Sequence, residues 1–80
     1  MKKLPQSFQN FFWEYNLRYL NIYKHKRLII ERILDRGRME QIKELFKIYS
    51  KSEIEKVIMK SPNLSKTTRR FWHTIFQFNE

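Results

Sequence analysis

The residues best suited to chemistry lie near the C-terminus, in a segment that predicts a helix over residues 65–78. One face of this helix carries cations and hydrogen-bond donors, and no acid appears in it before the terminal Glu80. Lysine and arginine bind phosphates or guanine edges, and hydroxyl groups donate to phosphates. The candidate nucleic-acid-binding residues of this segment are Ser65, Lys66, Thr67, Arg69, Arg70 and His73.

The other face of the same segment is apolar. Ser65 can cap the helix by accepting a backbone N–H of the first turn. Behind it, large side chains recur at the 3, 4, 7 spacing of one helical face, which predicts that they are buried. These positions are Leu64, Thr68, Phe71, Trp72, Ile75 and Phe76.

A short helix predicted over residues 53–60 precedes this segment. Ser52 and Glu55 have the spacing of a capping box, and Pro62 biases the residue before it away from helix. Two helices joined by a short turn, the second rich in cations, form a helix-turn-helix candidate. A three-helix core whose polar face never touches DNA would give the same pattern.

A second basic patch lies on and before a helix predicted over residues 21–36. Between Tyr15 and Ile30 the chain has no acid, and it holds Arg18, Lys24, Lys26 and Arg27 together with His25. Asn21 is a suitable helix cap, and an apolar stripe on this helix is formed by Ile22, Ile29, Ile30, Ile33 and Leu34. Gly37, the only glycine, stands where a helix end favours a left-handed residue.

The remaining segments are predicted to be scaffold. Met39, Ile42, Leu45, Phe46 and Tyr49 share one face of a helix over residues 39–49, whose outer charges alternate in sign. Residues 1–19 form an aromatic arm in which Pro5 can start a short helix. We expect this arm to cover the core, with Trp13 near Phe71 and Trp72. An exposed aromatic patch for a partner is the alternative.

Composition bounds the fold. Eighty residues make one domain, and thirteen aromatics with a single glycine favour an all-α, compact bundle of four to five short helices. The net charge of +9 favours polyanionic or acidic partners. The chain has no cysteine, and two histidines do not make a metal site, so neither a cofactor nor an enzyme activity is expected. A ribonuclease using His73, Arg69 and Arg70 would lack a second catalytic group.

No apolar run is long enough for a membrane span or a signal peptide, so a cytoplasmic protein without a membrane partner is expected.

Three signatures stand in order along the chain: Phe12-Trp13-Glu14-Tyr15, Ile29 to Gly37, and Leu64 to Trp72. Together they resemble a small prokaryotic family of unknown function over roughly residues 11 to 78. Its members are often encoded beside nucleotidyltransferase toxins of the AbiEii kind, so the resemblance implies an antitoxin-like or accessory role. It supports Trp13, Gly37, Ser65, Thr68, Phe71 and Trp72 as positions that define the fold, and it transfers no catalytic residue.

These observations predict a module that binds nucleic acid, with duplex DNA as the expected partner, and acts as an antitoxin-like or transcriptional accessory protein. Replacing Arg69 and Arg70 should then weaken duplex binding without harming the fold. The alternative is a protein-interaction module that neutralises an acidic partner enzyme, such as a cognate toxin, without contacting DNA. Helix-turn-helix proteins usually act as dimers, so a homodimer is a further candidate.

Overall fold

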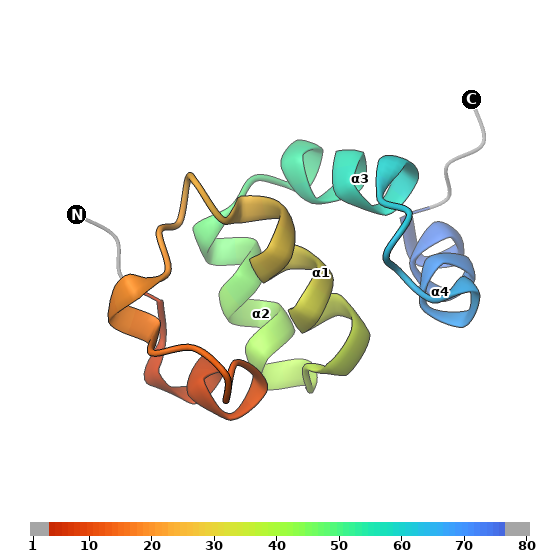
Figure 1. Ribbon diagram of the computed structural model, residues 1–80. Helices are drawn as coiled ribbons and strands as arrows, with labels where there is room; N and C mark the ends of the chain where they lie inside the picture. The colour runs from red at the N-terminus through yellow and green to blue at the C-terminus, as the bar shows by residue number, and fades with distance from the viewer. Residues whose placement is uncertain (1–3, 77–80) are drawn as a thin grey trace.

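The computed structural model describes residues 4–76, the side chain of Phe76 excepted, and it is all-helical over that range. Two short 3-10 helices lead into four α-helices (Figure 1). Their bounds are η1 Gln6–Phe11, η2 Leu17–Tyr19, α1 Lys26–Arg36, α2 Met39–Ile48, α3 Lys51–Lys60 and α4 Lys66–Phe76. The prediction of an all-α bundle is confirmed. None of the described helices is long and apolar enough to cross a membrane.

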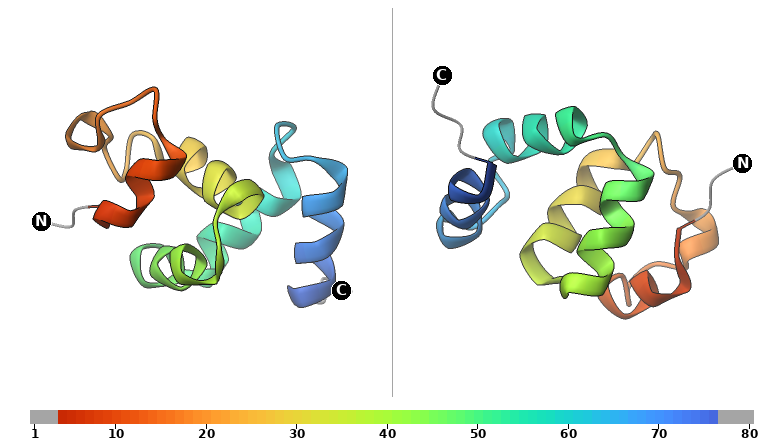
Figure 2. Two further views of the ribbon diagram at one scale, coloured as in Figure 1. Left: turned by 90° about the horizontal axis from the view of Figure 1, so that it is seen from below. Right: turned by 180° about the vertical axis from the view of Figure 1, so that it is seen from behind.

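Helix α1 is the centre of the molecule. It packs against both α2 and α3, and η1 lies against it as well. Helix α4 packs against α3 and lies crosswise to it, at the end of the molecule opposite η1 and η2 (Figures 1 and 2). The body extends 37 Å along its longest axis, so the N-terminal segment and α4 form two separate ends.

The core is built on the apolar face of α1, where Ile29, Ile30 and Ile33 are fully buried. Burying such a side chain stabilises the fold by about 1.5–3 kcal/mol. The other helices and the N-terminal segment each contribute large side chains to the same cluster. These include Phe8, Phe12, Leu20, Ile22, Leu34, Leu45, Tyr49, Ile54, Val57, Ile58, Leu64 and Trp72.

Helix α1 begins five residues later than the predicted range of 21–36. Asn21 does act as a cap, but of a single turn: its Oδ1 accepts the N–H groups of Tyr23 and Lys24, both at 2.8 Å. The N–H of Asn21 in turn donates to Nδ1 of His25 at 2.8 Å. These local bonds close a turn over residues 22–25, and α1 starts behind it at Lys26.

Helix α3 begins two residues earlier than predicted, because the capping box is Ser50 with Glu53. The hydroxyl of Ser50 accepts the N–H of Glu53 at 3.1 Å, and the Glu53 carboxylate accepts the N–H of Ser50 at 2.9 Å. Ser52 and Glu55 have the same spacing, but both lie inside the helix. Both serines have a glutamate three residues later, and the structure uses Ser50 as the N-cap of α3.

Gly37 is not left-handed, so that prediction is wrong. Its φ of −70° and ψ of 155° are extended values open to any residue. Glycine is required here by close packing instead, because a Cβ would lie 2.6 Å from the carbonyl oxygen of Ile33 and 3.3 Å from Cβ of Gln41. The missing side chain lets α1 turn directly into α2.

The N-terminal arm covers the core mainly with its phenylalanines, and Leu4 and Leu17 pack against it in part. Phe8 and Phe12 are fully buried, whereas Trp13 is 75% exposed. The prediction that Trp13 lies near Phe71 and Trp72 is wrong, because α4 lies at the other end of the molecule (Figure 1). The arm is fixed to α1 by Arg32, whose guanidinium donates to both carboxylate oxygens of Glu14 at 3.0 and 2.9 Å.

Candidate nucleic-acid interface

The start of α4 is fixed by Ser65, as predicted. Its hydroxyl oxygen accepts the N–H of Thr68 at 3.1 Å, which satisfies one of the free donors of the first turn. The same hydroxyl also lies 3.3 Å from Oδ1 of Asp35 at the end of α1. Ser65 is therefore occupied as a cap, and an acid from another helix stands beside it, so Ser65 is a poor phosphate donor.

A buried polar cluster holds the turn between α3 and α4. Ser61 is fully buried and donates its hydroxyl to Glu31 of α1, which is itself 8% exposed. Asn63 donates its own N–H to the Ser61 oxygen at 3.2 Å, and Arg27 pairs with Glu31 at 3.2 Å. Because buried polar groups are costly unless they are bonded, this cluster specifies where the chain turns toward α4.

Arg69 helps to hold the turn between α3 and α4 and is not part of the open face of α4. Its guanidinium donates to the carbonyl oxygens of Met59, at 3.3 Å, and of Ser61. Both carbonyls lie at the C-terminal end of α3, where the helix dipole favours a cation. Arg69 thus ties α4 to α3, and sequence reasoning could not separate it from its neighbour Arg70.

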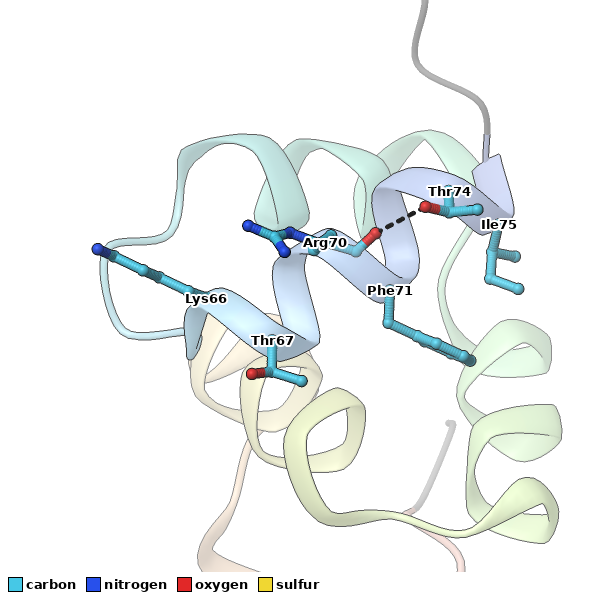
Figure 3. A pocket seen from close by; sticks show the side chains of 6 residues that line it. All are labelled: Lys66, Thr67, Arg70, Phe71, Thr74 and Ile75. Atoms are coloured by element: carbon cyan, nitrogen blue, oxygen red, sulfur yellow. Dashed lines mark hydrogen bonds between the residues drawn. The ribbon is translucent and has the colours of Figure 1, made fainter.

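The open face of α4 lines a shallow hollow of about 410 Å³ (Figure 3). Lys66 and Arg70 extend toward the N-terminal end of the helix, and Phe71 and Ile75 lie toward its C-terminal end. Among the described residues, the side chains of Lys66 and Arg70 form no ion pair, and α4 itself contains no acid. The hollow is lined by Lys66, Thr67, Arg70, Phe71, Thr74 and Ile75.

The apolar stripe of α4 is buried only in part, which corrects its predicted burial. Leu64 and Trp72 are buried, and the Trp72 ring lies 6.2 Å from that of Phe46 on α2. Phe71 and Ile75, however, are 56% and 53% exposed. The prediction for Phe76 concerns a side chain outside the described residues. The mixed hollow was missed because helical spacing alone assigned Phe71 and Ile75 to the core.

Two other polar residues of α4 contribute less to the hollow than their position suggests. The hydroxyl of Thr74 donates to the carbonyl of Arg70 at 3.1 Å, so it serves its own helix. His73 is exposed but does not line the hollow. Of the predicted residues on this helix, the fold brings Lys66, Thr67 and Arg70 together on one open face.

The second basic patch is divided by the fold. Lys26 pairs with Glu53 of α3 at 3.2 Å, and Arg27 pairs with Glu31. The pKa of Glu53 is lowered, first by the hydrogen bond from the Ser50 N–H and further by Lys26. Arg18 and Lys24 are exposed and have no ion pair among the described residues. Arg18 lies on η2, at the end opposite α4 (Figure 1).

The fold and this face define a small all-α domain that carries one open cationic helix at its end. The chain belongs to a family of unknown function, DUF6922, whose model matches residues 8–58. The predicted membership of an uncharacterised family is thereby confirmed for η1 through most of α3. The third signature, Leu64 to Trp72, lies beyond the matched residues. No curated protein and no solved structure matches the chain.

Proposed function

We propose that this domain binds nucleic acid, with duplex DNA as the target, through the open face of α4. The observation that carries the proposal is that Lys66 and Arg70 lie on the same exposed face of α4. Among the described residues, neither of them forms an ion pair with a carboxylate. Residues four apart lie one above the other on a helix, so two cations can follow a phosphate backbone. Thr67 between them supplies a hydroxyl donor.

The arrangement of α3 and α4 suits this role. Helix α4 lies crosswise to α3 at one end of the molecule (Figure 2). The six residues that line its hollow are all exposed. On its other side, α4 is held to α3 by Arg69, and the turn before it is held to α1 by the buried hydrogen bond between Ser61 and Glu31 (the Ser61 cluster). An α-helix held this way can enter a major groove while its cations contact the flanking phosphates. The biological role that fits best is an antitoxin-like or transcriptional accessory function.

The test is the affinity for a labelled duplex of the double variant Lys66→Ala/Arg70→Ala, measured by fluorescence anisotropy. Both side chains are exposed and unpaired in the described structure, so the fold should be unaffected. We expect affinity to fall at least about tenfold, because two phosphate contacts are lost. A variant that binds as tightly as the wild type would refute α4 as the interface.

The matched control is Lys43→Ala/Lys56→Ala on α2 and α3, two exposed lysines that form no ion pair among the described residues. It lowers the net charge from +9 to +7, as the α4 variant does, but it leaves α4 intact. We expect its affinity to stay within about threefold of the wild type, because long-range attraction is screened beyond about 10 Å at 0.1 M salt. Equal losses in both variants would mean that total charge, and not α4, governs binding.

A second candidate function is binding to an acidic partner protein, such as a cognate toxin. It is favoured by the exposed Phe71 and Ile75 beside the cations, since protein interfaces combine apolar anchors with charged neighbours. The variant Phe71→Ser/Ile75→Ser separates the two functions. Duplex affinity within about twofold of the wild type, with no loss of a co-purifying partner protein, supports the first function. Loss of co-purification with the product of a neighbouring gene, with duplex binding retained, would support the second.

A further inference from the structure

The end of the molecule opposite α4 displays aromatic rings to solvent. Trp13, Tyr19 and Tyr23 are 75%, 73% and 77% exposed, and Tyr15 is 41% exposed. Large aromatic side chains normally lose most of their surface on folding. The same stretch buries Phe8, Phe12, Leu20 and Ile22, and Phe11 and Leu17 are partly buried. In this segment the phenylalanine and aliphatic side chains therefore face the core, and the tryptophan and tyrosine side chains face the solvent.

The loops that carry these rings are held by side-chain amides. The Gln9 amide donates to the carbonyls of Phe12 and Tyr15, at 3.2 and 2.8 Å, and accepts the N–H of Leu17 at 3.4 Å. It thereby closes the loop from which Trp13 projects. A binding surface whose backbone is already fixed loses less conformational freedom when its ligand arrives.

The next two rings are held in a similar way. Asn16 accepts the N–H of Arg18 at 3.1 Å, which starts η2 with its Tyr19. Asn21 accepts the N–H groups of Tyr23 and Lys24, both at 2.8 Å. Three amide side chains thus hold three successive turns, and each turn presents at least one exposed ring.

Two cations stand next to these rings in the sequence: Arg18 precedes Tyr19, and Lys24 follows Tyr23. Arg18 and Lys24 are exposed and have no ion pair among the described residues. The one acid of the stretch, Glu14, is engaged by both terminal nitrogens of Arg32. The surface is therefore positively charged as well as aromatic, although Lys26 and Arg27 are neutralised by their partners.

We infer that this aromatic rim, formed by Trp13, Arg18, Tyr19, Tyr23 and Lys24, binds single-stranded nucleic acid. Exposed rings stack on the faces of unpaired bases, and the neighbouring cations attract the phosphates. An aliphatic patch would instead favour a protein, but every large apolar side chain exposed in this stretch is an aromatic ring. The segments that carry the rim form one edge of the molecule, away from α4 (Figure 1). The inference is independent of the duplex site.

The experiment uses a fluorescein-labelled oligothymidylate of about 15 nucleotides, a length that covers a typical single-strand site. Its affinity is measured by anisotropy in the Lys66→Ala/Arg70→Ala background, so that α4 contributes little. We expect Trp13→Ala/Tyr19→Ala to weaken binding at least tenfold, since removal of one stacking ring commonly costs about fivefold or more. Trp13→Phe keeps a ring and should bind within about threefold. The control is Met59→Ala, an exposed large apolar side chain on α3 outside both proposed surfaces, which should change nothing.

An unlabelled oligothymidylate tests the contact directly through tryptophan fluorescence. Trp13 is exposed and Trp72 is buried, so stacking should quench the emission of the wild type and leave that of Trp13→Phe unchanged. An oligouridylate of the same length distinguishes RNA from DNA. Unchanged affinity of Trp13→Ala/Tyr19→Ala would overturn the inference. So would equal displacement of the labelled strand by polyglutamate, because that result would indicate an acidic protein ligand.

Discussion

The two ends of this molecule expose different chemistry on frameworks of similar construction. At the N-terminal end, rings project from turns held by Gln9, Asn16 and Asn21. At the other end, α4 projects cations and two apolar side chains, and it is held by the Ser61 cluster and Arg69. In both cases polar side chains bond the backbone behind the exposed surface. The charged residues that build the framework are thus distinct from those that remain open for binding.

The comparison also shows why a count of charges along the chain misleads. The stretch from Tyr15 to Ile30 and the α4 segment both lack acids in sequence. Folding brings Glu53 to Lys26, and the next turn of α1 brings Glu31 to Arg27. Lys66 and Arg70 gain no such partner within the described structure. Each stretch therefore keeps only some of its cations open: Arg18 and Lys24 in the first, and Lys66 and Arg70 in the second.

The largest expected difference between the two ends concerns their tryptophans. Trp72→Ala should lower the free energy of unfolding by about 3–5 kcal/mol, because it empties a buried site beside Phe46. Trp13→Ala should change it by less than about 0.5 kcal/mol, as substitutions at exposed sites usually do. Urea unfolding followed by circular dichroism measures both. Similar losses in the two variants would contradict the assignment of Trp13 to a binding rim.

A smaller difference is expected between the adjacent arginines of α4. Arg69→Ala should cost about 1–2 kcal/mol of stability, because it removes two charge-assisted bonds to the end of α3. Arg70→Ala should be neutral to within about 0.5 kcal/mol but should weaken duplex binding. The same urea and anisotropy measurements apply to both. If Arg70→Ala is the more destabilising of the two, the division between framework and open face is wrong.

The smallest effect is the pH dependence of the N-terminal anchor. Arg32 donates to Glu14 and holds the pKa of that carboxyl below its usual value of 4.5. A carboxyl with a lowered pKa in the folded state contributes stability above about pH 4.5, and this is lost as the pH falls through its folded pKa. Wild-type stability should therefore drop more than that of Glu14→Gln between pH 7 and about pH 3. Equal drops would show that the Arg32 contact does not anchor the arm.

Local signals in the sequence predicted much of the fold. The stripe of Ile29, Ile30 and Ile33 and the Ser65 cap depend on neighbours within two turns, and both are as predicted. The prediction for Gly37 failed because glycine is needed there for close packing against Ile33 and Gln41, and not for a left-handed backbone. The prediction of the Ser52 cap failed because Ser50, two residues earlier, has an equally suitable glutamate and caps the helix.

Non-local contacts limited the prediction of the site. Arg69 and Arg70 are adjacent in sequence, and only the position of the α3 end separates their roles. The exposure of Trp13 and Phe71 depends on which elements cover them, and helical spacing does not contain that information. The three residues Lys66, Thr67 and Arg70 were found because they share one face of one helix.

The central claim is that α4 contacts phosphates, and the salt dependence of duplex binding tests it most directly. For each phosphate contact, the slope of log affinity against log salt changes by about 0.9. The account predicts a steep wild-type slope that becomes shallower by about 2 in Lys66→Ala/Arg70→Ala and stays unchanged in Lys43→Ala/Lys56→Ala. The same slope in all three proteins, or no duplex binding at about 50 mM salt, would contradict it.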